Sequence, residues 1–210
     1  MTRFLKTMLR AGLLALALAM AGTAQAVIID FGGLPGSNGD AFTGPYSEDG
    51  FIVTSDIGQA FEGHVFGNPR PSLVVGSVFG GGSLAAFEVV RSGGGTFIFN
   101  SFDVIGNNGP ARWFFSGSLG GVDALGGSHD GFTPNRVWTT INGGVTLIDT
   151  LRLVLVAAGD TTSANLDNIN LTVPEGSVPE PATWALMILG FGLVGGAMRK
   201  SKQRVRVTYA

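Results

Sequence analysis

Reactive side chains are few in this 210-residue chain, which has two histidines, His64 and His129, and no cysteine. Ser128, His129 and Asp130 have the residue types of a hydrolytic triad. A nucleophile, its base and the orienting acid converge from separate elements, however, which three adjacent residues cannot do. The glycines on both sides of this run predict a polar loop. Because the G-x-S-x-G, H-E-x-x-H and P-loop motifs are also missing, the sequence predicts a protein that is not an enzyme.

Carboxylates are the remaining candidates for chemistry, because their oxygens are the ligands that calcium prefers. No D-x-D-x-D-G loop is present. We expect Asp30 and Asp167, on the first and last predicted strands, to lie close together. Two interpretations stay open: each aspartate ends a strand or caps a turn, which is the favoured one, or the pair shares a structural calcium ion. No other cofactor is expected. Further acids that can supply oxygen ligands are Glu48, Asp49, Asp103, Asp123, Asp130 and Asp160.

Aromatic side chains offer a second kind of site, because a sugar ring stacks on an aromatic face. The candidates are Trp113 and Trp138, with Phe114 and Phe115 beside the first. Packing in the core is the favoured use of all four. A glycosidase would need two carboxylates facing each other across a cleft, and nothing in the sequence marks such a pair.

The charge of the chain is unevenly distributed. Residues 27–178 contain five arginines, no lysine and fourteen acidic residues, a formal charge of −9, whereas the whole chain carries −2. Such an acidic domain does not bind nucleic acid or anionic lipid. The lack of cysteine excludes disulfides and thiolate metal sites. The domain must therefore rely on its core, on strand pairing or on bound ions.

Residues 27–173 consist of short β-branched and aromatic runs separated by glycine-rich turns. No stretch keeps the 3.6-residue period of a helix. The pattern predicts nine to eleven strands in one all-β domain. The expected architecture is an antiparallel β-sandwich of jelly-roll or galactose-binding-like type.

Four stretches of this domain allow more specific predictions. In residues 96–105 the apolar positions change parity near Asn100, which indicates a bulge or two successive strands. Residues 151–156 are apolar except at Arg152, which predicts a central strand buried on both sides. Gly80–Gly82 and Asn142-Gly143 are each expected to form a hairpin turn.

The N-terminal segment has the three regions of a secretory signal peptide. Basic residues Arg3, Lys6 and Arg10 precede an apolar stretch over about residues 11–22. Ala24 and Ala26 then form a small-x-small cleavage site. The sequence thus predicts a signal peptide over residues 1–26 that signal peptidase removes.

The C-terminal segment has the features of a membrane anchor. After a linker at 174–178, Pro179-Glu180-Pro181 precedes an uncharged apolar run at 182–198, which is about 25 Å long as a helix. We predict a single transmembrane helix there, with Trp184 at the interface. A stop-transfer cluster follows and reaches into a basic cytoplasmic tail at 203–210, which places the β-domain on the exported side. The cluster comprises Arg199, Lys200, Lys202, Arg204 and Arg206.

Residues 179–202 resemble the PEP-CTERM sorting signal in its PEPxxWA variant, a domain also called the ice-binding protein C-terminal domain. The resemblance rests on Pro179-Glu180-Pro181, Trp184, the Gly-Phe-Gly at 190–192 and the basic end. It implies a Gram-negative host and a membrane exosortase that cleaves near the Pro-Glu-Pro. Ile-Asp-Phe at 29–31 and Leu-Asp-Asn-Ile at 166–169 are similar to exported galactose-binding-like sandwiches.

These features together predict a non-enzymatic protein of the cell surface or extracellular matrix. An inner-membrane-anchored intermediate would precede exosortase processing and release, so that membrane contact is transient. The alternative is a carbohydrate-binding module for cell-surface or exopolysaccharide glycans. A hydrolase that uses unrecognised acids ranks third.

Overall fold

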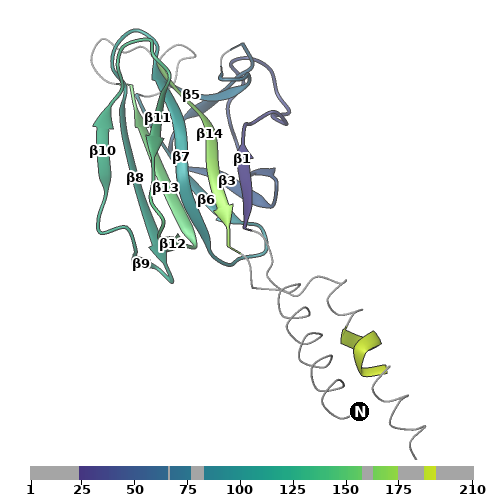
Figure 1. Cartoon of the computed structure of the whole chain (residues 1–210). Helices are drawn as coiled ribbons and strands as arrows, with labels where there is room; N and C mark the ends of the chain where they lie inside the picture. The colour runs from purple at the N-terminus through teal and green to yellow at the C-terminus, as the bar shows by residue number, and fades with distance from the viewer. Residues whose placement is uncertain (1–23, 66, 77–82, 158–162, 175–186, 193–210) are drawn as a thin grey trace, which may run out of the picture. The chain divides into compact units, whose positions relative to one another are not determined.

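The computed structural model describes residues 24–65, 67–76, 83–157, 163–174 and 187–192 (Figure 1). The chain divides into two units, Ala24–Pro174 and a second one made of Met1–Thr23 with Glu175–Ala210. In the second unit, residues 187–192 are helical. No helix within the described residues is long and apolar enough to cross a membrane.

Several predictions fall on residues outside the described ranges. They concern residues 1–23 of the signal peptide, most of the apolar run at 182–198, Trp184 and the basic cluster. Pro179-Glu180-Pro181 lies outside as well. These predictions stay predictions at the structural level.

The unit Ala24–Pro174 contains strands throughout its described length and no helix there. The strands are β1 (Gln25–Ile29), β2 (Tyr46–Glu48), β3 (Phe51–Gly58), β4 (Ala60–Gly63), β5 (Ser72–Gly76), β6 (Leu84–Arg91), β7 (Phe97–Gly106), β8 (Arg112–Leu119), β9 (Val122–Asp123), β10 (His129–Phe132), β11 (Thr139–Asn142), β12 (Leu147–Ile148), β13 (Thr150–Val156) and β14 (Ser163–Val173).

These described strands form two seven-stranded sheets, and every pair of named strands is antiparallel. Sheet A has the order β11-β7-β14-β5-β4, with β1 also on β14 and β12 also on β7. Sheet B has the order β10-β8-β13-β6-β3-β2, with β9 also on β8. Figure 1 shows the two sheets stacked as the layers of a sandwich. The predicted all-β antiparallel sandwich is confirmed.

A phenylalanine-rich core fills the space between the sheets. Phe99 contacts Phe115 from sheet B edge to face, with ring centroids 5.1 Å apart, and Phe51 meets Phe97 in the same way at 5.2 Å. Edge-to-face pairs are favourable because the positive ring edge meets the negative face. Aliphatic residues of β13 and β14 surround these rings. Because no disulfide is available, this core holds the sheets together.

The change of parity in β7 is a β-bulge. Phe97, Phe99, Phe102 and Val104 are all buried within one strand, although the spacing between the two middle ones is three residues. The pairing of β7 with β14 shifts register over the same stretch, between Asp167 and Leu171. An extra residue in each strand thus returns both apolar series to the core.

Three other predictions differ from the structure. β13 is central, but only its inner residues are fully buried, because no layer of described residues covers the outer side of sheet B there. β5 and β6, the strands expected to form a hairpin, belong to different sheets; Gly80–Gly82 lies outside the described residues. β11 and β12 both pair with β7 and not with each other. Asn142-Gly143 therefore does not form the predicted hairpin turn between them. A two-residue hairpin lies instead at Gly120-Gly121, where both φ angles are positive.

Replacing Phe99 with alanine should lower the free energy of unfolding by about 3–5 kcal/mol, because it removes a buried ring from between two others. Urea denaturation followed by tryptophan fluorescence measures this. Val145→Ala is the control, since Val145 is 90% exposed, and should change stability by less than about 0.5 kcal/mol. Equal effects of the two substitutions would contradict the assignment of the core.

Candidate functional site

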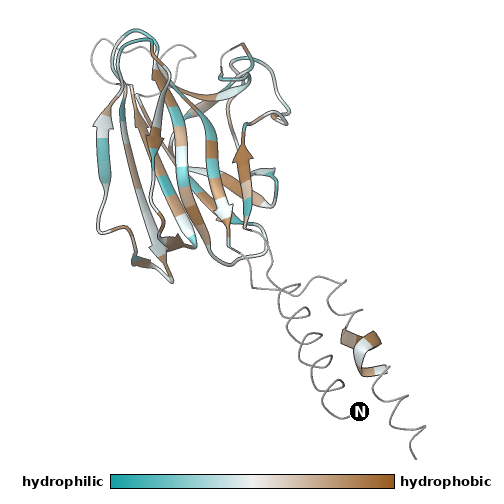
Figure 2. Cartoon of the chain, viewed as in Figure 1, coloured by the Kyte–Doolittle hydropathy of each residue, from teal (hydrophilic) through white to brown (hydrophobic). Residues whose placement is uncertain are grey.

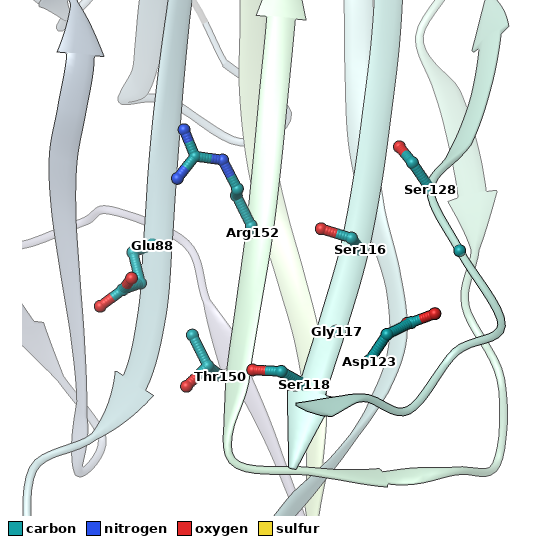
Figure 3. Close-up of a pocket in the computed structure, with 9 residues that line it drawn as sticks. Glu88, Ser116, Gly117, Ser118, Asp123, Ser128, Thr150 and Arg152 are labelled. Atoms are coloured by element: carbon teal, nitrogen blue, oxygen red, sulfur yellow. The ribbon is translucent and has the colours of Figure 1, made fainter. Parts of the chain in front are cut away.

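A cleft of about 470 Å³ lies on the outer side of sheet B (Figure 3). A second hollow of about 350 Å³ shares Ser116, Ser128 and Arg152 with it and adds Phe114, Phe115 and Val154. The two form one elongated groove along β8 and β13, which we call the sheet B groove. The cleft itself is lined by Glu88, Ser116, Gly117, Ser118, Asp123, Gly127, Ser128, Thr150 and Arg152.

Strand alternation places the polar side chains of this groove. In β13 the odd-numbered leucines point into the core, so Thr150, Arg152 and Val154 point outwards. Arg152 lies directly opposite Glu88 on β6 and opposite Ser116 on β8. Figure 3 shows these three side chains projecting from neighbouring strands. One row across the sheet therefore presents a carboxylate, a guanidinium and a hydroxyl.

The segment between β9 and β10 forms one wall of the groove. The Asp123 carboxylate accepts a hydrogen bond from Leu125 N at 3.1 Å, and the Leu125 carbonyl lies 3.2 Å from His129 Nε2. The His129 ring stacks on Phe115, with centroids 4.7 Å apart and planes at 16°. These contacts fix Ser128 at the rim.

The charged groups of the groove remain accessible. Arg152 Nη1 lies 2.5 Å from Asp56 Oδ2, but both side chains are 36% exposed, so the pair contributes little to stability. Among the described residues, the Glu88 carboxylate has no hydrogen-bond or ion-pair partner. Both groups can therefore exchange water for a polar ligand.

An arginine between two rings marks the far end of the same face. Arg112 Cζ lies 4.4 Å from the centre of the Phe114 ring and 5.6 Å from that of Phe132. Its Nη2 donates to Asp130 at 2.9 Å. The groove thus passes from a polar end to an apolar one.

The structure places Trp113 and Trp138, the candidates for sugar stacking, in different surroundings, and their stacking role stays a prediction. Trp113 points inwards and packs against Phe102 and Phe115, because the odd positions of β8 face the core. Trp138 is half-buried in the connection from β10 to β11. The run Ser128-His129-Asp130, predicted as a polar loop, continues into strand β10, where His129 and Asp130 contact different groups on opposite sides. Sequence reasoning missed Glu88 and Ser116, and the single charge in the apolar run of β13 was the available signal.

The two aspartates of the calcium hypothesis lie in a second polar cluster, on the outer side of sheet A. Asp167 is buried, and its oxygens accept hydrogen bonds from Asn68 N at 2.5 Å and Asn168 N at 2.8 Å. Burial, together with the smaller effects of the charges of Asp103 and Asp30, raises the pKa of Asp167 to about 7, although these two hydrogen bonds lower it. The expected proximity is therefore present.

A cation site is not evident in this cluster. Asp30 Oδ1 accepts a hydrogen bond from Gly32 N at 2.8 Å, as in a turn. No group of three or more acidic or histidine side chains within the described residues is arranged to hold a metal ion. The capping contacts are thus visible, and the shared calcium ion stays a prediction.

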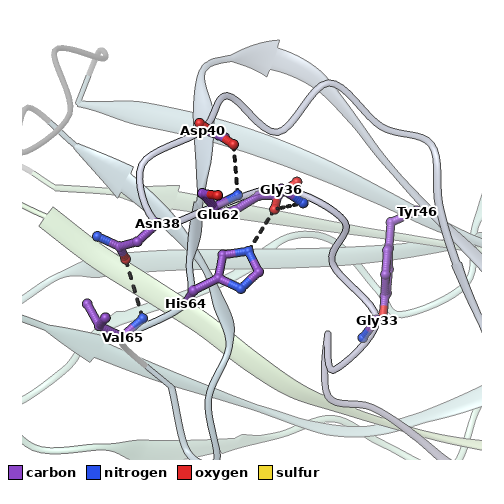
Figure 4. A network of polar contacts seen from close by, with 9 residues as sticks. Gly33, Gly36, Asn38, Asp40, Tyr46, Glu62, His64 and Val65 are labelled. Atoms are coloured by element: carbon purple, nitrogen blue, oxygen red, sulfur yellow. Dashed lines mark hydrogen bonds and ion pairs between the residues drawn. The ribbon is translucent and has the colours of Figure 1, made fainter.

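Two further carboxylates fasten the loop between β1 and β2. Glu48 accepts hydrogen bonds from Phe31 N at 3.1 Å and from the Tyr46 hydroxyl at 3.0 Å. Burial, followed by the hydrogen bond with Asp30, raises the pKa of Glu48. Glu62 accepts from Gly36 N at 2.8 Å and lies 2.9 Å from His64 Nε2 (Figure 4). Both carboxylates accept hydrogen bonds from the backbone of this loop, and neither lines the sheet B groove.

The comparisons with known proteins concern the two parts of the chain separately. Residues 177–202 match the family model described as the PEP-CTERM protein-sorting motif. The chain carries this sorting motif. The match includes the predicted Pro179-Glu180-Pro181 and Trp184 as well as the first three basic residues, but it ends before Arg204. No curated protein matches the sequence significantly.

Solved structures resemble the β-unit in fold. A family 32 carbohydrate-binding module from C. perfringens in complex with galactose is 12% identical, with 62% of this chain and 98% of that one covered and a TM-score of 0.41. A family 29 module from Piromyces equi is 11% identical, with 73% and 93% covered and a TM-score of 0.42. A DUF4465 family protein from Bacteroides caccae is 9% identical, with 72% and 100% covered and a TM-score of 0.42.

The cluster around Asp167 predicts a pH dependence of stability. The pKa of Asp167 is raised from 3.8 to about 7 in the folded chain, so the folded state binds more protons between these values and stability falls as the pH rises through them. The slope is at most about 1.4 kcal/mol per pH unit. Urea midpoints at pH 5.0 and 7.5 measure it. Asp167→Asn should flatten the profile and the exposed control Asp123→Asn should not; stability that rises over this window would oppose the assignment.

Proposed function

We propose that the chain is an exported, non-catalytic protein of the cell surface or extracellular matrix, and that it holds a polysaccharide in the sheet B groove. An exosortase processes its C-terminal signal. The observation that carries the binding role is the groove itself. It is an elongated hollow on an uncovered sheet face, and its polar groups are free to exchange partners.

The sorting role follows from the PEP-CTERM motif at residues 177–202. In this proposal the signal peptide 1–26 directs export, and a transmembrane helix at about 182–198 holds the intermediate in the inner membrane. The basic residues after it stay in the cytoplasm. Exosortase then cuts near Pro179-Glu180-Pro181, and the β-unit reaches the surface or the matrix.

The chemistry of the groove suits a saccharide. Sugar hydroxyls donate to carboxylates such as Glu88 and accept from guanidinium groups such as Arg152. Ser116 and Thr150 supply neutral partners between them. The apolar end at Phe114 and Val154 offers a surface for the C–H face of a ring. Because the two hollows are continuous, the groove fits several units of a polymer.

Substitutions in the groove test polysaccharide binding. Glu88→Gln and Arg152→Gln should each weaken retention by about tenfold or more, since each removes a charged hydrogen-bond partner. Affinity electrophoresis against a panel of soluble bacterial polysaccharides measures this. Asp49→Asn is the matched control, because Asp49 occupies an exposed turn outside the groove, and should bind as the unaltered protein does. If no polysaccharide retards the unaltered protein, the binding role is wrong.

Replacing Pro179, Glu180 and Pro181 with alanines should keep the protein in the membrane fraction, because the processing enzyme loses its recognition site. Immunoblots of membrane and secreted fractions from an exosortase-bearing host measure this. Mass spectrometry of the normally released form should show a C-terminus upstream of Tyr209-Ala210. A released protein that keeps those two residues refutes processing.

A further inference from the structure

Four exposed aliphatic side chains gather at one end of the β-sandwich. They are Leu119 (43% exposed), Val122 (69%), Val145 (90%) and Leu147 (41%), and we call them the apolar end patch. Isolated exposed aliphatic residues are common, but a group of them marks a contact surface. Figure 2 shows hydrophobic colour on β9 and β12, at the end of the sandwich where these residues lie.

Hydrogen bonds join the two halves of the patch. Leu119 pairs with Val122 across the tight Gly120-Gly121 turn. Asp149 N donates to the Ser118 carbonyl at 2.8 Å, and Gly120 N donates to Asp149 Oδ2 at 2.6 Å. The turn of sheet B is thereby fastened to the chain that follows Leu147 on the edge of sheet A. Residues of both sheets therefore hold the patch in place.

The patch lies at the end where both terminal segments leave the sandwich. Leu147 on β12 is opposite Ile98 on β7, and Ile98 is opposite Thr172 near the end of β14. The first residue of β1, Gln25, pairs with Val173. The segment that precedes the fold and the segment that leads to the sorting motif therefore start from this end.

We infer that the apolar end patch rests on the exported surface of the lipid bilayer while the precursor is anchored. This inference relies on the proposed membrane-anchored intermediate. Seven residues lie between Pro174 and Ala182, where the apolar run begins. The eight Cα–Cα steps span at most about 29 Å, so the chain leaves the sandwich within that distance of the membrane. At that separation even a weak apolar contact is populated, because tethering raises its effective concentration.

Charge selects the kind of lipid. The segments that carry the patch, residues 116–125 and 143–149, contain Asp123 and Asp149 but no lysine or arginine. Zwitterionic phospholipid therefore suits the patch, and anionic lipid does not. The contact holds the sandwich against the membrane, so that Pro179-Glu180-Pro181 is presented close to the surface in which the processing enzyme is embedded.

Fluorescent labelling of the full 210-residue chain tests this contact. The chain has no cysteine, so Val122→Cys and Val137→Cys each create a single labelling position for the environment-sensitive dye NBD. Val137 is also an exposed valine, but it follows Arg136, whose backbone N–H bonds to Gly106 at the other end of β7. The vesicles are phosphatidylcholine, with or without brominated acyl chains that quench nearby dyes.

Flotation with the vesicles first shows that the chain is anchored. We expect bromine quenching at position 122 to be at least about twofold greater than at 137, and Leu147→Ser to reduce it to the level at 137. Equal quenching at the two positions overturns the inference alone. A blue shift at 122 without bromine quenching indicates contact between copies of the chain and also overturns it. A chain that does not float refutes both the anchored intermediate and the contact.

Discussion

Every other feature of the β-unit depends on one constraint, the two-residue alternation of its central strands around a shared phenylalanine core. Side chains of β7 and β14 meet those of β8 and β13 between the sheets. β7 and β14 would lose this alternation halfway along, because their apolar residues change parity. A bulge shared by the two strands restores it, and Asn168 adopts a positive φ of 47° there, a conformation that asparagine tolerates better than most residues.

The same constraint decides what the outer faces can do. Because core packing uses every second residue, the alternate residues of sheet B are free to form a groove, and those of sheet A form a polar ladder. On sheet A, Asn100 donates to Asn170 and Thr172, and Asn165 donates to Ser72. These side chains form hydrogen bonds with one another, whereas the Glu88 carboxylate on sheet B has no hydrogen-bond partner among the described residues. The ladder therefore fits a structural role and the groove fits a binding role.

A chain without disulfides must hold its long loops in another way, and here buried and half-buried carboxylates do so. Asp167, Glu48 and Glu62 each accept backbone N–H groups from loops distant in sequence. Burying a carboxylate is costly unless such donors compensate it, which explains why acids that look like ligands are already occupied. At Asp167 the backbone donors offset only part of the cost of burying the charge, and the pKa of its carboxyl group is therefore raised.

Much of the fold could be predicted from the sequence, and the features that could not be predicted have physical causes. The sandwich and the parity change in β7 follow from local periodicity, because strand ends and parity are local properties. The approach of Asp30 to Asp167 depends instead on the pairing of β1 with β14, which periodicity does not determine. The sorting motif is a contiguous string. The groove is not, since Glu88, Ser116 and Arg152 come from three strands that meet only through tertiary register. Trp113 packs against the core, the use that the sequence favoured over sugar stacking, because the odd positions of β8 face inwards.

The position of the groove relative to the chain ends bears on how anchoring and binding coexist. The groove runs along β13 on the side of the sandwich, while both terminal segments leave from the end that carries Leu147 and Val173. The groove begins beside the apolar end patch, at Ser118 and Asp123, and extends away from it to Val154. In the proposed anchored state, the part along β13 therefore faces water. The proposed processing leaves the groove residues unaltered, because all of them precede the sorting motif at 177–202. The proposed anchoring and the proposed polysaccharide binding are therefore compatible in one β-unit.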